Sequence, residues 1–142
     1  MQNANSEEVL DKLIAKDPRF HREAYLFVRE GIDYAQRQIS KASKSKVRHV
    51  TGQELLGALR EFGLAQFGPL TSTVLEEWGV RTCEDFGTIV FSMVDHGLLS
   101  KTDEDSMDDF KGGYDFDAAF RKPFLPQKAA SPFPRPEKES KV

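Results

Sequence analysis

Apolar residues recur at every third or fourth position over long stretches of the chain, which is the spacing of amphipathic helices. The longest stretch predicts a helix over residues 18–39, with Asp17 as its N-cap and Pro18 in its first turn. Asn5 or Ser6 is predicted to cap a shorter helix before it. The apolar stripe of the long helix consists of Phe20, Ala24, Phe27, Val28, Ile32, Ala35 and Ile39.

Three more helices follow, each with a local start signal. Thr51 and Glu54 have the spacing of a capping box, in which each side chain satisfies a backbone amide of the other residue. Thr82 and Asp85 form a second cap pair, and Pro69 suits the first turn of the helix between them. The three helices are predicted at 51–66, 69–78 and 83–96.

The order of the elements predicts a mostly α fold. Gly97 suits the end of the third of these helices, and residues 98–101 and 112–116 are predicted to pair as a short β-hairpin. Three helices followed by a hairpin are typical of a winged helix. We therefore expect two N-terminal helices packed on a winged-helix-like three-helix core at 51–118, in a single domain over 5–120.

The residues after 120 differ in charge and composition from the rest. The net charge of −3 divides into +4 for residues 121–142, with six bases against two acids, and −7 for the remainder. The same 22 residues contain five of the seven prolines. Such a segment buries too little apolar surface to order itself, so we predict a disordered, basic, Pro-rich tail.

The helix–hairpin face is predicted to bind a protein and not DNA. A winged helix places its third helix and its wing against phosphates, and here that helix carries Glu84, Asp85 and Asp95. The predicted wing adds Asp103, Glu104, Asp105, Asp108 and Asp109. Each acid near a phosphate costs about 1 kcal/mol at moderate salt. The candidates for protein contact are Phe91, Asp95, Asp103, Asp105 and Asp109.

Phe91 has two interpretations. It stands at the edge of the polar face of its helix, where an aromatic residue can serve as an anchor for a partner protein. Alternatively, the wing or the first helix covers its ring.

A second hypothesis, from another class of function, concerns nucleic acid. The predicted loop at 40–49 carries four bases and no acid, which suits contact with phosphates without reading of bases. With the basic tail it predicts a nucleic-acid- or ribosome-associated protein; the other interpretation is a solvated linker. The candidate residues are Lys41, Lys44, Lys46 and Arg48.

No arrangement of residues indicates catalysis, a cofactor or a metal. The acidic stretch lacks the glycine and glutamate that a calcium loop needs at its sixth and twelfth positions, counted from Asp103. Cys83 is expected to be a small packing residue beside two acids. The sequence thus favours a non-enzymatic protein, with the oligomeric state, a homo-oligomer included, left open.

The single cysteine favours a reducing compartment. No stretch of 18 apolar residues predicts a membrane span, and the N-terminus lacks the features of a signal peptide. The expected location is the cytoplasm.

Four segments, RHVTGQELL, EEWGV, EDFGTIVFSMVDHGLLSK and YDFDAAF, together resemble an uncharacterised bacterial protein family restricted mainly to planctomycetes and verrucomicrobia. The resemblance covers the residues from 5 to 120. It implies a one-domain bacterial cytoplasmic protein with a variable tail. It implies no activity, because the family has none established that could be transferred to a residue here.

Overall fold

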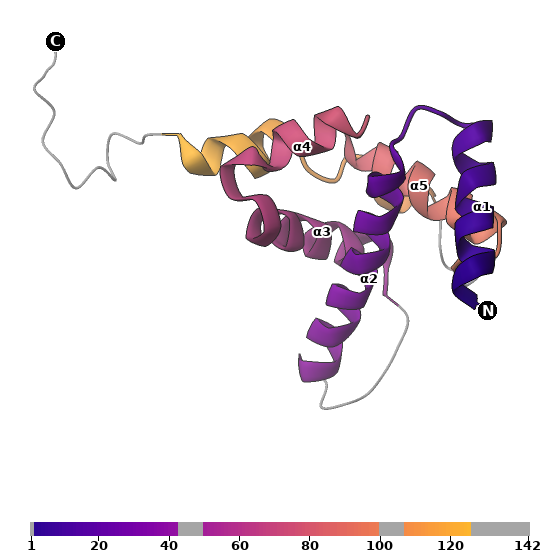
Figure 1. Cartoon of the computed structure of the whole chain (residues 1–142). Helices are drawn as coiled ribbons and strands as arrows, with labels where there is room; N and C mark the ends of the chain where they lie inside the picture. The colour runs from indigo at the N-terminus through magenta and orange to yellow at the C-terminus, as the bar shows by residue number, and fades with distance from the viewer. Residues whose placement is uncertain (1, 43–49, 100–106, 126–142) are drawn as a thin grey trace, which may run out of the picture.

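The computed structural model describes residues 2–42, 50–99 and 107–125 of the chain (Figure 1). These residues form five α-helices and four short helical turns, and they contain no β-strand. The helices are α1 (Gln2–Lys16), α2 (Arg22–Ala42), α3 (Gly52–Phe67), α4 (Thr71–Glu77) and α5 (Cys83–Asp95). The turns are η1 (Gly68–Leu70), η2 (Met107–Phe110), η3 (Asp117–Arg121) and η4 (Lys122–Phe124).

Helix α2 is the central element, because it packs against α1, α3 and α5 (Figure 1). Its crossing with α3 is close at Gly31, where a Cβ atom would lie 2.3 Å from Leu59 Cδ2. A larger residue at this position would push against the Leu59 side chain, so glycine favours the close approach of the two helices. The buried side chains of these two helices include Phe27, Val28, Ala35, Leu55, Leu56 and Leu59.

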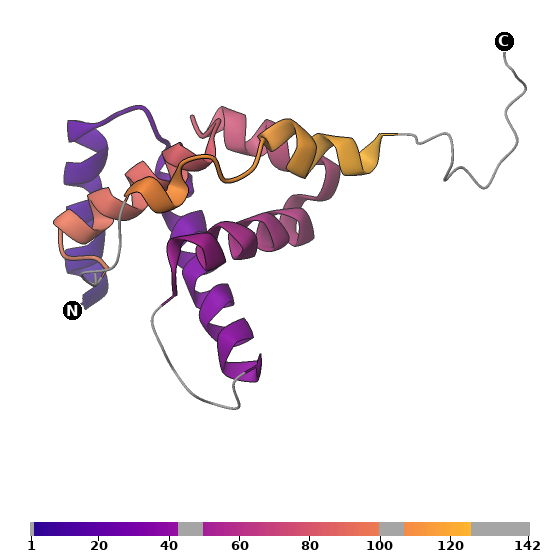
Figure 2. The ribbon, with the colours of Figure 1, turned by 180° about the vertical axis from the view of Figure 1, so that it is seen from behind.

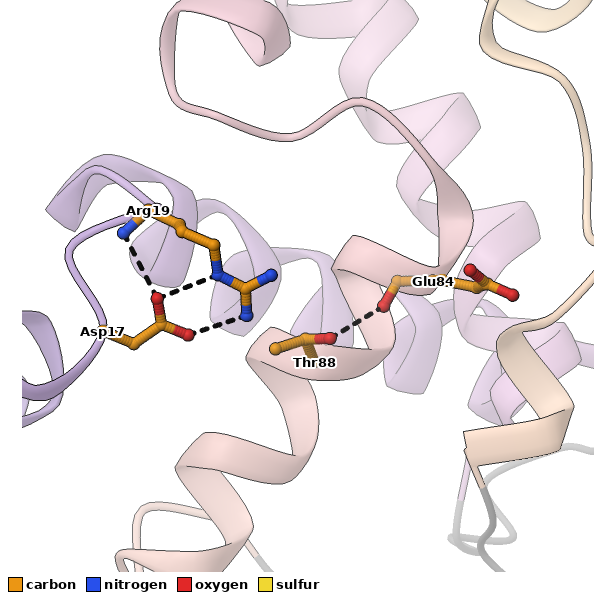
Figure 3. Close-up of polar contacts among 4 residues, drawn as sticks. All are labelled: Asp17, Arg19, Glu84 and Thr88. Atoms are coloured by element: carbon orange, nitrogen blue, oxygen red, sulfur yellow. Dashed lines mark hydrogen bonds and ion pairs between the residues drawn. The ribbon is translucent and has the colours of Figure 1, made fainter.

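The start of α2 differs from the prediction. The carboxylate of Asp17 accepts hydrogen bonds from the backbone N–H of Arg19 at 3.3 Å and from its guanidinium Nε and Nη2 at 2.9 and 2.8 Å (Figure 3). Asp17 thus stabilises a turn, and the Arg19 guanidinium lowers the pKa of its carboxyl. Phe20 turns into the core, and α2 begins only at Arg22. Helix α1 begins at Gln2, ahead of its predicted caps.

The same turn is joined to the end of α4. The backbone N–H of His21 donates to the carbonyl of Trp78 at 3.0 Å. Gly79 has a φ of +91°, and a Cβ atom on it would lie 2.1 Å from the carbonyl oxygen of Arg19. The two loops can approach only because residue 79 has no side chain.

Both predicted capping boxes are confirmed. The Thr51 hydroxyl accepts from the Glu54 N–H at 3.1 Å, and the Glu54 carboxylate accepts from the Thr51 N–H at 3.0 Å. Thr82 and Asp85 make the equivalent pair of bonds at 3.2 Å each. Further along α5, the Thr88 hydroxyl donates to the backbone carbonyl of Glu84 at 3.2 Å (Figure 3).

The end of α5 also follows the prediction. Leu98 N–H donates to the carbonyl of Met93 at 2.8 Å and Gly97 N–H to that of Val94 at 3.1 Å. Gly97 has a φ of +80°, so this is a Schellman closure with glycine in the left-handed conformation.

The predicted hairpin and winged-helix core are wrong for the part of the chain that the structure describes. Residues 98–99 and 112–115 belong to no strand, and Met107–Phe110 forms the turn η2. The reason is tertiary packing: Phe110 is buried against α5, where a Cβ atom on Gly87 would lie 2.8 Å from its Cγ. Tyr114 is held on α3, since its hydroxyl donates to the carbonyl of Leu56 at 2.8 Å. Residues 100–101 lie outside the described part.

Helical structure continues a few residues past the predicted boundary at 120. Phe120 is buried, and the Arg121 guanidinium Nε donates to the Ser72 hydroxyl at 3.0 Å, which joins η3 to α4. η4 follows directly and carries the chain outward at the end of the molecule away from α1 (Figures 1 and 2). The remainder of the predicted tail, residues 126–142, lies outside the described residues.

Candidate functional site

A largely apolar groove of about 160 Å³ lies where α2, α3, α5 and η2 meet. Figure 2 shows η2 beside α5. The second half of α2 forms one wall, the start of α3 closes one end, and the C-terminal half of α5 forms the opposite wall. The groove is lined by Ile32, Gln36, Val50, Thr51, Gly52, Leu55, Val90, Phe91, Val94, Leu99, Asp109 and Phe110.

Two aromatic rings build the wall between α5 and η2. The ring of Phe91 stands nearly perpendicular to that of Phe110, at 87°, with 6.2 Å between the ring centroids. Phe110 is buried and Phe91 is half-buried, so Phe91 presents the more accessible ring to the groove. η2, which stands in the place of the expected wing, thus covers the Phe91 ring only in part.

Two glycines set the position of η2. A Cβ atom on Gly87 would lie 2.8 Å from Phe110 Cγ, and one on Gly52 would lie 2.6 Å from Asp109 Cβ. The amide of Gln53 also donates to the backbone carbonyl of Asp109 at 3.1 Å. The depth of the groove therefore depends on small residues in α3 and α5 that let η2 approach.

The rim of the groove on the η2 side is acidic. Asp109 lines the groove and is half-buried, and Asp108 beside it is exposed and pairs with Lys111 at 3.4 Å. Asp95 is exposed one helical turn beyond Phe91. The polar groups on the α2 and α3 side of the lining, Gln36 and Thr51, are uncharged.

The structure brings together two of the five predicted protein-contact residues. Phe91 and Asp109 both line the groove, and Asp95 lies nearby on the exposed surface of α5 without lining it. Asp103 and Asp105 lie outside the described residues. In the sequence they fall between Leu99 and Asp109, which both line the groove.

Of the four predicted nucleic-acid contacts, the structure describes Lys41 alone. It is exposed in the last turn of α2, where it lines a separate depression with Gln36, Arg37 and Ser40. The first residues of the predicted loop are therefore helical. Lys44, Lys46 and Arg48 lie outside the described residues.

Sequence reasoning missed the α2 wall of the groove, formed by Ile32 and Gln36. The sequence did contain a signal on α5, where apolar residues at helical spacing form a face that is wider than the surface covered by the core. Ile89 and Met93 on that face are fully buried, whereas Val90 and Val94 are half-buried and line the groove.

Cys83 does not form a reactive site. Its side chain is buried, its Sγ accepts from the N–H of Tyr114 at 3.3 Å, and its S–H faces the Tyr114 carbonyl at 3.4 Å. Burial raises the pKa of the Cys83 thiol, which keeps it protonated at neutral pH. Burial also raises the pKa of the Tyr114 hydroxyl. Both groups serve to hold the segment after η2 against α3 and α5.

Within residues 2–42, 50–99 and 107–125, no three His, Cys, Asp or Glu side chains lie together in a way that would hold a metal ion. Over the same ranges, none of the helices has the length and apolar character needed to cross a membrane.

Comparison with known protein families, with curated proteins and with solved structures finds no match to this chain. Membership of the planctomycete and verrucomicrobial family is a proposal based on the four sequence segments. The groove is the feature of the structure that bears on function.

Proposed function

We propose that this chain is a non-enzymatic protein-interaction module, whose groove takes one large apolar side chain of a partner protein. The observation that carries the proposal is the size and lining of the groove. An apolar cavity of about 150 Å³ holds a molecule of benzene in another protein. The groove here has a volume of about 160 Å³, which is enough for the ring of one phenylalanine.

The side chains of the groove suit such an anchor. Phe91 and Phe110 offer ring edges and faces, and Val90 and Val94 offer methyl groups on the same wall. Removing a phenylalanine side chain from water contributes about 1.5–3 kcal/mol. Buried aromatic anchors of this kind carry much of the binding energy in protein interfaces.

The acidic residues around the groove favour basic residues beside the phenylalanine of the partner. Asp109 lines the groove, and Asp95 is exposed close by. Basic residues beside the anchor would face these carboxylates, which adds up to about 1 kcal/mol per exposed pair and speeds association. The partner segment that fits best is therefore a phenylalanine flanked by lysine or arginine.

The test uses a pentapeptide with phenylalanine between two pairs of lysines, titrated into the ¹⁵N-labelled full chain. We expect amide shifts at Val90, Val94 and Gly52, which lie around the groove. A peptide with alanine in place of phenylalanine should give no such shifts, and one with glutamates in place of lysines should bind more weakly. Absence of shifts with the first peptide, or shifts confined to another surface, would contradict the proposal.

A matched pair of variants identifies the groove as the binding site. Val94→Arg places a cationic chain in the groove, and Val74→Arg makes the same change at a half-buried valine of α4 that does not line it. We expect only Val94→Arg to abolish the shifts, with thermal unfolding used to show that both variants fold. Equal loss in both would show that the effect is not local.

A nucleic-acid-associated function is the second candidate. One observation favours it: Arg37 and Lys41 are both exposed on the last turns of α2, directly before the segment that contains Lys44, Lys46 and Arg48. A salt series with a single-stranded RNA distinguishes the two functions. Binding that falls steeply with salt and is lost in Lys41→Glu would support the second candidate. Binding that is absent at low salt would exclude it.

A further inference from the structure

The described residues include exposed apolar side chains of the type that we propose for the groove. Three large hydrophobic side chains are exposed among them: Leu70 at 62%, Leu125 at 56% and Phe124 at 46%. Phe124 and Leu125 stand at the end of η4 and contribute little to the core of their own chain.

The surroundings of Phe124 have the charge that the groove favours. Arg121 and Lys122 precede it and are exposed, whereas Asp109, Asp95 and Asp108 lie at or near the groove. The segment from 121 to 125, RKPFL, is thus a phenylalanine with basic residues on its N-terminal side.

Phe124 is held far from the groove of its own chain. η3 is anchored to α4 by the hydrogen bond from Arg121 to Ser72 and by the buried Phe120, and η4 follows η3 directly. Figures 1 and 2 both show η4 at one end of the molecule and the C-terminal part of α5 at the other. An encounter between Phe124 and the groove therefore requires two molecules.

We propose that Phe124 of one copy of this chain enters the groove of a second copy, with Lys122 facing the acidic rim. This inference rests on the proposed function and names the partner as the chain itself. The two contacting surfaces are different, so the contact is head-to-tail and leaves a free groove and a free Phe124 at the ends of every assembly that does not close into a ring. The contact is small, and such small interfaces are weak, so association is expected at high protein concentration.

The experiment is sedimentation velocity of the full chain over a concentration series. The wild-type chain should show a mass that rises with concentration beyond a dimer. Phe124→Ala removes the anchor and keeps the groove, and Val94→Arg blocks the groove and keeps the anchor. Each variant alone should remain monomeric, with association weakened about thirtyfold or more, the loss typical of a central anchor.

Mixing the two variants provides the decisive result. The only intact pair in the mixture is Phe124 of the Val94→Arg chain with the groove of the Phe124→Ala chain, so the mixture should form a 1:1 dimer and nothing larger. Leu70→Ala, which removes an exposed leucine without basic neighbours of its own, should associate like the wild-type chain. Lys122→Glu should weaken association about fivefold, as expected for loss of one exposed charge pair.

Three outcomes would overturn the inference: a wild-type chain that stays monomeric at millimolar concentration, a Phe124→Ala chain that associates normally, or a mixture that does not dimerise. None of these affects the lysine-flanked peptide. If that peptide still shifts the amides of the groove, the proposed function stands and only the identity of the partner is wrong.

Discussion

Helix α2 has two neighbouring sides that differ in how well they are filled. At Gly31 it meets α3 so closely that Leu59 is completely buried, with 0% of its surface exposed. At the next residue, Ile32, it faces α5 and η2 across a groove of about 160 Å³. Both sides are apolar, yet only one is closed. Apolar residues on this helix thus have two surroundings: the first side is closed by α3 and holds the fold together, and the second lines the groove that we propose as the binding site.

The largest expected effect is on the free energy of unfolding, when one apolar side chain on each side is replaced by alanine. Leu59→Ala should lower the free energy of unfolding by about 2–5 kcal/mol, because it leaves a cavity in a closely packed crossing. Val94→Ala, on the half-buried wall of the groove, should cost about 1 kcal/mol or less. Urea unfolding followed by circular dichroism measures both. Similar losses in the two variants would show that the groove is part of the core.

The next largest difference in stability is expected between two glycine-to-alanine variants. Gly31→Ala brings a methyl group against Leu59 Cδ2 and should destabilise the chain by about 1–3 kcal/mol, as overpacking does. Gly57→Ala, at an exposed position of α3 where a Cβ atom meets nothing within 4 Å, should stabilise it by about 0.5–1 kcal/mol. Opposite signs in the two melting temperatures are expected. A gain in both would mean that the crossing is looser than described.

Gly87→Ala tests whether η2 determines the shape of the groove. The added methyl group would lie 2.8–2.9 Å from three atoms of Phe110, so that ring must move. We expect a loss of about 1 kcal/mol in stability, since the helix gains from alanine part of what the displaced ring loses. Binding of the lysine-flanked peptide should fall further than stability does. Unchanged peptide binding would show that Phe110 does not shape the site.

The smallest effect concerns a polar atom that is buried near the start of α2. The Tyr25 side chain is completely buried and packs edge-to-face with Phe20 at 6.4 Å, and its hydroxyl has no hydrogen-bond partner within the described residues. Burial raises the pKa of this hydroxyl. Tyr25→Phe removes a polar group that is costly to bury, so stability should stay unchanged or rise by about 1 kcal/mol. A clear loss on thermal unfolding would reveal a partner for this hydroxyl.

The helices could be predicted from the sequence because their signals are local. Capping boxes at Thr51 and Thr82 and the glycine closure at Gly97 depend on residues within a few positions of each other. Asp17 has the same local form as an N-cap, but its bidentate pairing with Arg19 and the inward turn of Phe20 delay the helix to Arg22.

The absence of the predicted hairpin from the described residues could not be predicted from the sequence, because this segment is held by contacts between residues that are far apart in the chain. Phe110 belongs against Gly87, and the Tyr114 hydroxyl against the Leu56 carbonyl, and neither pairing has a local signature. The site divides in the same way. Phe91 and Asp109 could be selected by their positions at a polar edge and in an acidic run, whereas Ile32 and Gln36 reach the groove only through the packing of α2.

The most direct test of the groove as a binding site is a set of intermolecular nuclear Overhauser effects between the full chain and the acetylated, amidated peptide RKPFL. The account predicts cross-peaks from the phenylalanine ring of the peptide to the methyl groups of Ile32, Val90 and Val94, which line the groove. Cross-peaks confined to Leu70, or to any surface away from α2 and α5, would contradict it, as would a bound peptide whose ring contacts no methyl group of the groove.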